Sequence, residues 1–572
     1  MFTFESREIV PLDGIWSFRF TEGGALEDAA PQNGQYDDIM PVPAVFDLQV
    51  RYLRKRGLAC YRRTFRLAAP CPAALLRVDG IGLCARFWID GTEVGTADMA
   101  YNPYVFKTGA LAAGMHVIEM AIDNRLSKDT PFFKPNYDFY AHGGVYRSLS
   151  LEALPEGIAL ERIQVRTLDY RTGKVSLRVL LRGCTSPRKV SASIRFDTDD
   201  APRAVTLDAA PTPLAPEGEA TLEMVVPKHR LWSPKTPALH TLTCSLADSG
   251  DTLAETFGIR DIRTSGGKLY LNGEPLWLLG FNRHESHPEL GPVLPESVML
   301  TDLEHMRELG CNFVRGAHYP QDPRFLDLCD RFGFLVWEEG LAWGNEAPVL
   351  SDPVFIDGQI AQMRRMVRQS VNHPSVIIWA FLNEFDSGSD AGVSLCRRLV
   401  DTLKEEDASR LVTFACNRGG NDRCSGMVDL VSFNTYPGWC WPEAIEQEPE
   451  EMISAAIESN IRHFLKIRKP DAPIIVSEMG CCGIYGTHDD AAAQWTEEFE
   501  LRYVRASYEA AVACPEIQGF TVWQLNDCYS YHRKGGSLRG KPFGQNLAGA
   551  FDIYRRRKLA GYPGALFSKP HP

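Results

Sequence analysis

Two glutamates stand at the ends of apolar segments whose lengths suit buried β-strands. Glu384 follows the apolar run Ser375–Leu382, from which only Asn383 separates it, and Glu478 directly follows Ala472–Ser477. A carboxylate at the end of a buried strand loses solvation free energy unless it is paired or used. Hydrolysis of a glycosidic bond with retention needs two carboxyl groups, one as acid/base and one as nucleophile. The alternative is that both glutamates only cap their strands or pair with arginines.

Both segments belong to a series of strand candidates that alternates with helical patterns after Lys268. Met299, Leu303 and Met306 fall at i, i+4 and i+7 and predict one core-facing helix stripe, which Gly310 is placed to end. Eight strands alternating with helices indicate a (β/α)₈ barrel, whose site forms at the carboxyl ends of the strands. The eight candidates are Leu276–Phe281, Asn312–Gly316, Phe334–Glu338, Val376–Asn383, Leu411–Ala415, Leu430–Asn434, Ile474–Glu478 and Gly519–Trp523.

Polar side chains gather at the carboxyl ends of these strand candidates. Any one of them could serve as a structural cap, but such ends meet at a single mouth of a barrel. The polar and aromatic residues concerned are Asn282, Arg283, His284, Glu285, Arg315, His318, Tyr319, Glu338, Glu339, Asn383, Glu384, Asn434, Tyr436, Glu478, Trp523 and Gln524. The sequence therefore predicts one polar, aromatic-lined site.

The chain before the barrel consists of short β-strand patterns. Turn signals such as Asp90-Gly91 separate them, as in sandwiches and hairpins. A second stretch of about 100 residues has the rhythm of an immunoglobulin-like sandwich. We therefore predict a multidomain β and α/β protein: a jelly-roll sugar-binding domain (1–155), an immunoglobulin-like β-sandwich (156–263) and a (β/α)₈ TIM-barrel catalytic domain (264–572).

Composition excludes several classes of function. The formal net charge of the 572 residues is -12 and no basic block occurs, so we expect no nucleic-acid partner. No apolar stretch approaches membrane-spanning length and Met1–Arg19 lacks the features of a signal peptide, so we expect no membrane association. The 15 cysteines follow no repeating spacing, which favours a reducing, cytoplasmic location. Glycine-rich phosphate loops are absent, so no nucleotide cofactor is suggested.

Specific motifs occur in order over the whole length of the chain. They are REIVPLDGIWSFRF, YDFYAHGGVYR, LWSPKTPALHTL, FGIRDI, GFNRHESHPELG, VRGAHYPQDPRFLDLCDRFGFLVWEE, NHPSVIIWAFLNE and VSEMG. With them the chain resembles glycoside hydrolase family 2, and within it the β-glucuronidase branch. The resemblance implies a retaining double displacement on a small-molecule or oligosaccharide β-glycoside. It also implies that the reaction requires no metal or other cofactor, and that the protein is a homo-oligomer.

The resemblance also assigns roles to individual residues. Glu384 matches the acid/base and Glu478 the nucleophile, and a retaining pair lies about 5–5.5 Å apart. Glu478 should then stay ionised while Glu384 is held protonated, partly by the charge of its partner. Asn383 matches the asparagine that binds the sugar 2-hydroxyl, and Trp523 the platform under the ring. Further sugar-binding positions are matched by Asp138, His318, Asn434, Tyr436 and Asn546.

One departure from the family pattern bears on the substrate. Glucuronidases of this type carry an Asn-x-Lys motif whose lysine binds the sugar carboxylate, but here Asn546 is followed by Leu547 and Ala548. Alanine cannot pair with a carboxylate, and an unpaired buried charge is costly. Either the substrate is a neutral sugar such as a β-galactoside, or another basic group meets the carboxylate. Candidates for that group are Arg533, Lys534, Arg539 and Lys541.

These observations favour a retaining exo-β-glycosidase, and within that class a β-hexuronidase with galacturonide preference, since the first two domains are glucuronidase-like. The alternatives are a β-galactosidase and a non-catalytic carbohydrate-binding homologue. The presence of both Glu384 and Glu478 argues against a non-catalytic homologue, because a protein without the activity has no reason to keep either glutamate.

Overall fold

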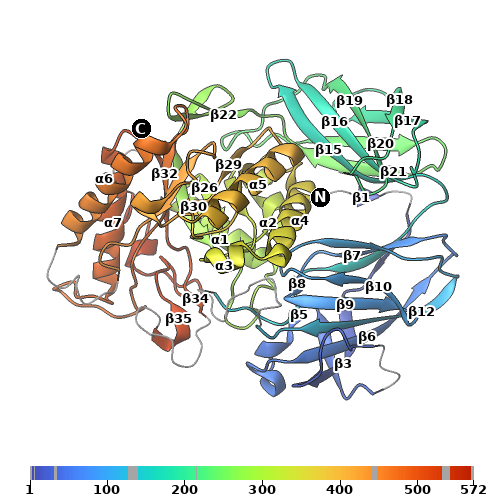
Figure 1. The fold of residues 1–572 in the computed structure, drawn as a ribbon, viewed down its shortest axis with the longest axis horizontal. Helices are drawn as coiled ribbons and strands as arrows, with labels where there is room; N and C mark the ends of the chain where they lie inside the picture. Colours follow the sequence, from blue (N-terminus) through green and yellow to red (C-terminus); the bar gives the residue numbers. More distant parts are fainter. Residues whose placement is uncertain are drawn as a thin grey trace.

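The computed structural model describes residues 3–4, 7–30, 35–126, 139–213, 215–439, 448–530 and 542–567. Antiparallel sheets of two β-sandwiches lie on the right of Figure 1, and a barrel of parallel strands with helices around it lies in the centre and on the left. This confirms the predicted fold class of sandwiches followed by a barrel. Asp138 and Arg533, two of the predicted sugar-binding residues, lie outside the described residues.

The first sandwich, drawn in blue, encloses an aromatic core. Along its strand over residues 14–21, Trp16 and Phe18 are buried while Ile15 and Ser17 are exposed, the period of two expected of a half-buried strand. The larger sheet contains, in spatial order, β10 (Thr92–Ala97), β9 (Cys84–Ile89), β12 (Gly114–Asp123), β6 (Leu58–Leu67), β3 (Gly14–Thr21) and β4 (Asp38–Val42).

Two smaller sheets and two short 3₁₀ segments complete this sandwich. One sheet contains β11 (Tyr104–Lys107), β7 (Ala74–Val78), β14 (Leu149–Ala153) and β2 (Ile9–Pro11), and the other β5 (Ala44–Val45), β13 (Gly144–Val145) and β8 (Ile81–Gly82). The 3₁₀ segments are η1 (Phe46–Leu48) and η2 (Val50–Tyr52). Tyr319 and Leu341 of the barrel join the same hydrophobic core, so the sandwich packs directly on the barrel.

The second sandwich has a core of aliphatic residues such as Val175, Leu177 and Ile194. Its larger sheet contains β1 (Thr3–Phe4), β21 (Thr252–Phe257), β20 (His240–Leu246), β17 (Arg188–Phe196) and β18 (Arg203–Ala209), and its smaller sheet β15 (Ala159–Asp169), β16 (Lys174–Arg182) and β19 (Gly218–Val225). Because β1 pairs with β21, the first strand of the chain lies in the sheet of the second sandwich.

The barrel is a parallel sheet that closes on itself. Its strands follow one another as β29 (Leu411–Thr413), β28 (Val376–Ala380), β27 (Leu335–Glu339), β26 (Phe313–Gly316), β25 (Leu278–Arg283), β33 (Ile517–Val522), β32 (Ile474–Met479), β31 (Val431–Asn434) and β30 (Ala415–Cys416). Only Phe414 separates β29 from β30, so the nine segments occupy the eight predicted strand positions. The fourth strand ends at Ala380, before the predicted Asn383, because Leu382 turns out of the strand with a φ of 47°.

Helices cover the outside of the barrel (Figure 1). They are α1 (Glu296–Glu308), α2 (Pro323–Phe332), α3 (Ala347–Leu350), α4 (Pro353–Ser370), α5 (Asp390–Glu406), α6 (Pro449–Ile467) and α7 (Glu497–Ala513). The predicted stripe of Met299, Leu303 and Met306 is fully buried, and Gly310 follows α1 with a φ of 79°. None of the helices in the described part of the chain is long and apolar enough to cross a membrane.

The remaining short elements close the two ends of the barrel. A small sheet of β22 (Ile262–Ser265), β23 (Lys268–Leu271) and β24 (Glu274–Leu276) brings Ile262, Leu269 and Leu271 into the core that fills the amino end of the barrel. At the other end, β34 (Cys528–Tyr529) pairs with β35 (Gln545–Asn546). The 3₁₀ segments of the barrel are η3 (Gly419–Asn421), η5 (Pro542–Gly544) and η6 (Leu559–Gly561).

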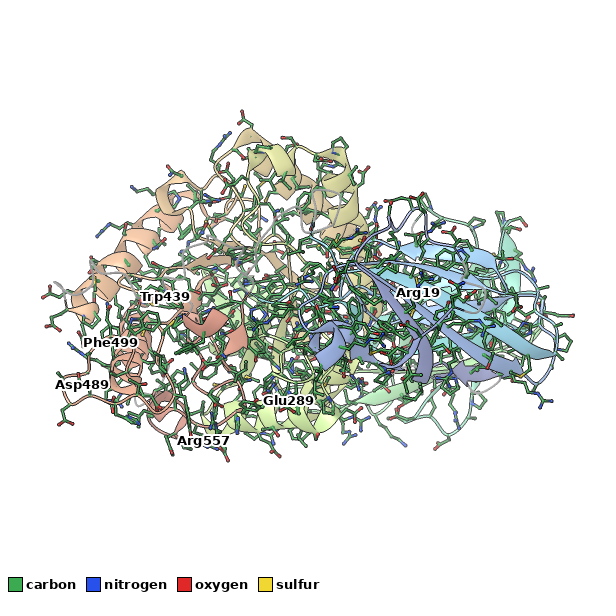
Figure 2. The ribbon with its side chains drawn as sticks, turned by 90° about the horizontal axis from the view of Figure 1, so that it is seen from below. Arg19, Glu289, Trp439, Asp489, Phe499 and Arg557 are labelled. Atoms are coloured by element: carbon green, nitrogen blue, oxygen red, sulfur yellow. The ribbon has the colours of Figure 1, made fainter. Side chains whose placement is uncertain are left out.

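Seen from below, the molecule divides into the same halves (Figure 2). Arg19 of β3 lies on the sandwich half, and Trp439, Phe499 and Glu289 lie on the barrel half. Segments that follow the carboxyl ends of barrel strands include Glu289 after β25 and Trp439 after β31. These segments frame the candidate site.

Candidate active site

Glu384 sits at the barrel mouth, four residues beyond the end of β28. Its backbone has a φ of 55°, and its N–H donates to the carbonyl oxygen of Ala415 on β30 at 3.0 Å. Its Oε1 accepts a hydrogen bond of 2.9 Å from Nδ2 of Asn434, at the end of β31. The side chain is half-buried. The backbone of Glu384 is therefore fixed, and its carboxyl group accepts a hydrogen bond from a neutral amide. The side chain remains partly accessible to solvent.

Glu478 lies within β32 and is only 3 % exposed. Its Oε1 accepts from Nη1 of Arg315, and its Oε2 accepts from the hydroxyl of Tyr436. A hydrogen bond that a carboxylate receives from a cation is charge-assisted and stronger than one between neutral groups. The environments of the two glutamates thus differ, since Glu478 faces a guanidinium and Glu384 faces an amide.

Hydrogen bonds connect Glu384 to Ser477, the residue that precedes Glu478. Asn434 donates from Nδ2 to Glu384, and its Oδ1 accepts from the hydroxyl of Ser477 at 2.7 Å, the residue before Glu478. Asn434 Nδ2 also lies 3.2 Å from Oδ1 of Asn383. Asparagine and serine side chains at neighbouring strand ends therefore fix the relative positions of Glu384 and Glu478.

Asn383 contributes an amide donor that no described residue satisfies. Its Oδ1 accepts from Nη2 of Arg315 at 2.8 Å, whereas its buried Nδ2 has no hydrogen-bond partner in the described part of the chain. A buried donor without an acceptor costs roughly 1–3 kcal/mol. This position is therefore well suited to donate to an oxygen of a bound ligand.

Arg315 is the charged centre of the site and is fully buried on β26. It donates to Glu339 from Nη2 at 2.8 Å, to Glu478 from Nη1, and to Oδ1 of Asn282 at 2.9 Å. Its guanidinium also stacks 4.7 Å from the ring centre of Trp337. Burial alone would lower the pKa of Arg315, but the carboxylates of Glu339 and Glu478 raise it above its usual value.

Glu339 is the second carboxylate that Arg315 holds. Burial opposes its ionisation, but Arg315 and His318 keep the pKa of Glu339 below its usual value. Its Oε2 accepts from the indole N–H of Trp337 at 2.8 Å, and its Oε1 lies 2.9 Å from Nδ1 of His318. The contact fixes the imidazole so that Nε2 lies 3.9 Å from Oε1 of Glu478.

Aromatic rings form one wall of the site. Trp523, which follows β33, stacks on His318 with ring centres 5.4 Å apart and an interplanar angle of 11°. His284, which follows β25, meets Trp523 edge-on at 5.4 Å. Flat aromatic faces of this kind pack against the apolar faces of ligands. The first sandwich adds to this wall, because Phe139 lies 5.2 Å from the ring of His284.

The first sandwich also braces the loop behind His318. Arg147 donates from Nη2 to Oε2 of Glu285 at 3.0 Å and to the carbonyl oxygen of Pro320 at 2.7 Å. Tyr101 stacks on Tyr319 with ring centres 3.7 Å apart. Since Tyr319 follows His318 directly, these buried contacts fix the position of the histidine from a separate sandwich.

Asn546 lies at the edge of the mouth, on β35, and is buried. Its backbone carbonyl oxygen lies 3.4 Å from Nε2 of Gln524, and the carbonyl oxygen of Ala548 accepts from the N–H of Gln524 at 2.7 Å. The segment that contains Ala548 thus runs beside the residue that follows Trp523.

Among the predicted site residues, the structure brings seven together at one mouth. These are Glu384, Glu478, His318, Asn383, Asn434, Tyr436 and Trp523. Arg315 and Glu339 were predicted among the polar groups at the strand ends but were given no role, and Ser477 was not predicted. Arg315 contacts Glu478 and Asn383. Glu339 contacts Arg315 and His318, and Ser477 donates to Asn434. An arginine inside the apolar strand pattern Asn312–Gly316 was the available signal, since such a residue must be paired when buried.

One group of metal-ligand type exists elsewhere in the barrel. Within the described residues, only Asp327, Asp330 and His373 hold three ligand atoms of suitable kind within 4.8 Å of one another. His373 Nδ1 contacts Oδ2 of Asp330 at 2.6 Å. Although burial would lower the pKa of His373, Asp330 raises it, and the contact between this imidazole and carboxylate explains why the groups lie together.

Comparison with protein families identifies two matching regions. The model described as "Glycosyl hydrolases family 2, TIM barrel domain" matches residues 262–527, and the one described as "Glycosyl hydrolases family 2" matches residues 158–260. The β-glucuronidase of Chlorocebus aethiops is 26% identical over 553 residues, which cover 87% of this chain and 82% of that protein. The β-galactosidase of Vibrio vulnificus strain CMCP6 is 29% identical over 484 residues, which cover 75% of this chain but 45% of that protein.

A solved structure matches the chain over its entire length. The family 2 β-galacturonidase from Eisenbergiella tayi bound to galacturonate superimposes with a TM-score of 0.88 and 28% sequence identity. The match covers 100% of this chain and 99% of that one. Both sandwiches and the barrel therefore have counterparts in a single solved protein.

Proposed function

This chain belongs to glycosyl hydrolase family 2, a family of retaining glycosidases that act on β-linked sugars, and from that premise we propose that it is an exo-β-hexuronidase with galacturonide preference. The observation that carries the catalytic part is the pairing of Glu384 and Glu478 through Asn434 and Ser477 at the mouth of the barrel. Two carboxylates in different environments at one site are the requirement for this reaction.

In the first step, Glu478 attacks the anomeric carbon while Glu384 donates its proton to the departing glycosidic oxygen. The aglycone leaves as an alcohol and a covalent glycosyl ester remains on Glu478. The contacts from Arg315 and Tyr436 support this role, because they hold the carboxyl group of Glu478 in a fixed orientation. The same contacts must loosen as the negative charge moves from the carboxylate into the ester bond.

In the second step, Glu384, now deprotonated, takes a proton from a water molecule that attacks the anomeric carbon. The ester bond breaks, Glu478 regains its charge, and the sugar leaves with its original β configuration. The partial exposure of Glu384 supports this assignment, since water must reach the acid/base. Asn383, with its unsatisfied Nδ2, is placed beside Glu384 to donate to a sugar hydroxyl.

One comparison supports the uronide preference. The β-galacturonidase of Eisenbergiella tayi matches the chain from end to end, whereas the β-galactosidase match covers 45% of that longer protein. Ala548 stands where glucuronidases of the family place the lysine that binds the sugar carboxylate, so a different cation must bind the carboxylate of a uronide. Arg533, Lys534, Arg539 and Lys541 are our candidates, and they lie outside the described residues.

The experiment that tests the proposal compares four p-nitrophenyl substrates: β-galacturonide, β-glucuronide, β-galactoside and β-glucoside. We expect the highest kcat/KM on the β-galacturonide, and NMR of the first product anomer should show retention. The highest value on the β-galactoside would favour the second candidate, a neutral β-galactosidase in which Ala548 lines a pocket without a charge. No turnover of any of the four would contradict the proposal of an active glycosidase.

The cation is identified by alanine substitution of the four basic candidates. The residue that binds the carboxylate should raise KM for uronides when replaced, and leave the residual activity on neutral glycosides unchanged. Arg19, which lies on the sandwich half of the molecule in Figure 2, supplies a control outside the candidate site.

A further inference from the structure

Lys558 is a lysine with no exposed surface, and its ammonium group contacts segments that follow strands of the candidate site. Nζ lies 2.6 Å from the carbonyl oxygen of Gly483 and 2.9 Å from that of Leu547. It also lies 3.0 Å from Oδ1 of Asp527 and 3.4 Å from Oε1 of Glu500. A buried ammonium is tolerated only when it is paired and its donors are satisfied. Here four acceptors surround three donors.

The acceptors come from segments that follow the strands of the site. Gly483 comes five residues after Glu478, and Asp527 four residues after Trp523. Leu547 lies between Asn546 and Ala548, in the segment where glucuronidases of the family carry their Asn-x-Lys motif. A single cation therefore ties together three loops that carry or follow proposed substrate-binding groups.

Backbone hydrogen bonds make the same three loops one unit. The N–H of Gly483 donates to the carbonyl oxygen of Leu547 at 3.1 Å, and Oδ1 of Asp527 accepts from the N–H of Gly549 at 2.8 Å. A Cβ added at Gly549 would lie 2.3 Å from the backbone nitrogen of Asp527, so the loops are packed without spare room. Displacement of Leu547 would therefore move its neighbours Asn546 and Ala548.

Two buried carboxyl groups neighbour the ammonium group of Lys558. Asp527 and Glu500 come from two different elements, the loop after β33 and helix α7, and both are fully buried. Burial raises the pKa of Asp527 to about 7 although Lys558 opposes it, and the two carboxyl groups together raise the pKa of Lys558.

We propose that Lys558 is a positioning residue of the enzyme: its buried ammonium holds residues 546–549 against the loops that follow Glu478 and Trp523, and so sets sugar affinity without contacting the sugar. This inference rests on the proposed function. Small displacements of binding groups carry large effects, since a misplacement of about 1 Å can cost roughly 100-fold in rate. Arg315 and Asn434 hold the two glutamates independently of Lys558, so sugar binding should suffer more than the chemical step.

The test is the kinetic comparison of wild type, Lys558→Met and Arg7→Met on p-nitrophenyl β-galacturonide, or on whichever of the four glycosides the wild type prefers. Arg7 is the matched control, because its guanidinium is equally buried and pairs with Glu152 and Asp251 at the contact between the two sandwiches. We expect Lys558→Met to raise KM, and the Ki of the free product sugar, by about 10- to 100-fold with a smaller change in kcat. Arg7→Met should lower Tm but leave KM unchanged.

A second variant decides the question if Lys558→Met does not fold. Gly549→Ala keeps the charge cluster and forces the same loop away from Asp527, so it should raise KM in the same direction. Unchanged KM and Ki in both variants, with an active wild type, would overturn the inference and leave the proposed function standing. An equal rise of KM in Arg7→Met would also overturn it, because a general loss of stability would then explain the effect. Failure of the wild type on all four substrates would overturn both proposals.

Discussion

Side chains that point into the barrel change from apolar to polar along each strand. At the amino end the interior is filled by Leu278, Phe313 and Leu335, and by Ile475 across the barrel, all essentially without exposure. At the carboxyl end of the same strands, Asn282, Arg315, Glu339 and Ser477 take their place two or four residues later. The pairing register shifts between β27 and β28 and on both sides of β32. The two ends also differ in the polarity of the side chains that fill the interior.

The interior of the barrel is thus filled in two ways, by apolar side chains at one end and by paired polar and charged side chains at the other. Apolar side chains at the amino end gain free energy from burial, at roughly 25 cal/mol per Å² of apolar surface, and need no specific charged partner. The charges at the carboxyl end are stable only as a set, because each buried ion requires its partner. A substitution at the amino end should therefore cost stability and leave activity, whereas one at the carboxyl end should cost activity first.

The largest expected effect comes from Glu478→Ala. We expect a loss of roughly 10⁴-fold or more in kcat/KM, since the covalent step has no other nucleophile. Added azide should restore part of the turnover and form a glycosyl azide of inverted configuration, because it can enter the space left by the carboxylate. Retention of more than about one per cent of wild-type activity would contradict the role of Glu478 and weaken the contrast between the two barrel ends.

Arg315→Met should damage both properties at once. It leaves Glu339 and Glu478 buried without their cation, and we expect a loss of about 3–5 kcal/mol in the free energy of unfolding together with loss of turnover. Urea denaturation and the four-substrate assay measure the two effects. The control is Arg51→Met, whose exposed pairs with Asp37 and Asp38 are screened by solvent and should contribute little to stability. Equal losses of stability in Arg315→Met and Arg51→Met would show that burial of Arg315 with Glu339 and Glu478 does not determine the size of the effect.

Leu335→Ala tests the opposite end of the strand that carries Glu339. Removal of its buried side chain should cost about 3 kcal/mol in the free energy of unfolding, through lost burial and the cavity left behind. At 25 °C, where the variant remains folded, kcat/KM should stay at the wild-type value. A drop in kcat/KM comparable to that of Arg315→Met would contradict this expectation, because the apolar amino end and the polar carboxyl end of the barrel interior would then not be independent.

Glu338 extends the comparison to the outer face of the barrel. It neighbours Glu339 but contacts Ser370 of α4, and burial raises its pKa from 4.5 to about 7. Because the pKa of Glu338 is higher in the folded than in the unfolded protein, binding of a proton to Glu338 favours the folded state. This contribution to the free energy of unfolding is complete below about pH 4.5 and is lost as the pH rises through about 7.

Glu338→Gln should remove this pH dependence. Relative to the wild type, the free energy of unfolding of the variant should improve by about 2 to 3 kcal/mol between about pH 5 and about pH 8, as measured by urea denaturation. Parallel pH profiles for the two proteins would show that Glu338 is already ionised in the folded state. The Glu339→Gln variant is the internal comparison, and it should lower activity because Glu339 holds Arg315.

Local patterns were sufficient for much of this architecture. The apolar runs before Glu384 and Glu478, the stripe of Met299 and Met306, and the strand-end positions all follow from periodicity, which is a property of neighbouring residues. The motif resemblance added the expected role of each glutamate. What the pattern could not give is the end of β28 at Ala380, because the turn at Leu382 depends on contacts made by Asn383 with the loop of Gly344.

The sequence by itself determined that strands and helices alternate after the sandwiches and that two carboxylates stand at strand ends, because hydrogen bonding and burial of neighbouring residues depend on local order. The tertiary structure alone decided that Arg315 pairs with both Glu339 and Glu478, and that Lys558 reaches loops as distant in sequence as Gly483. Such contacts depend on closure of the barrel, which brings together groups that no local spacing connects. The burial that closure creates is also what makes these charges dependent on one another.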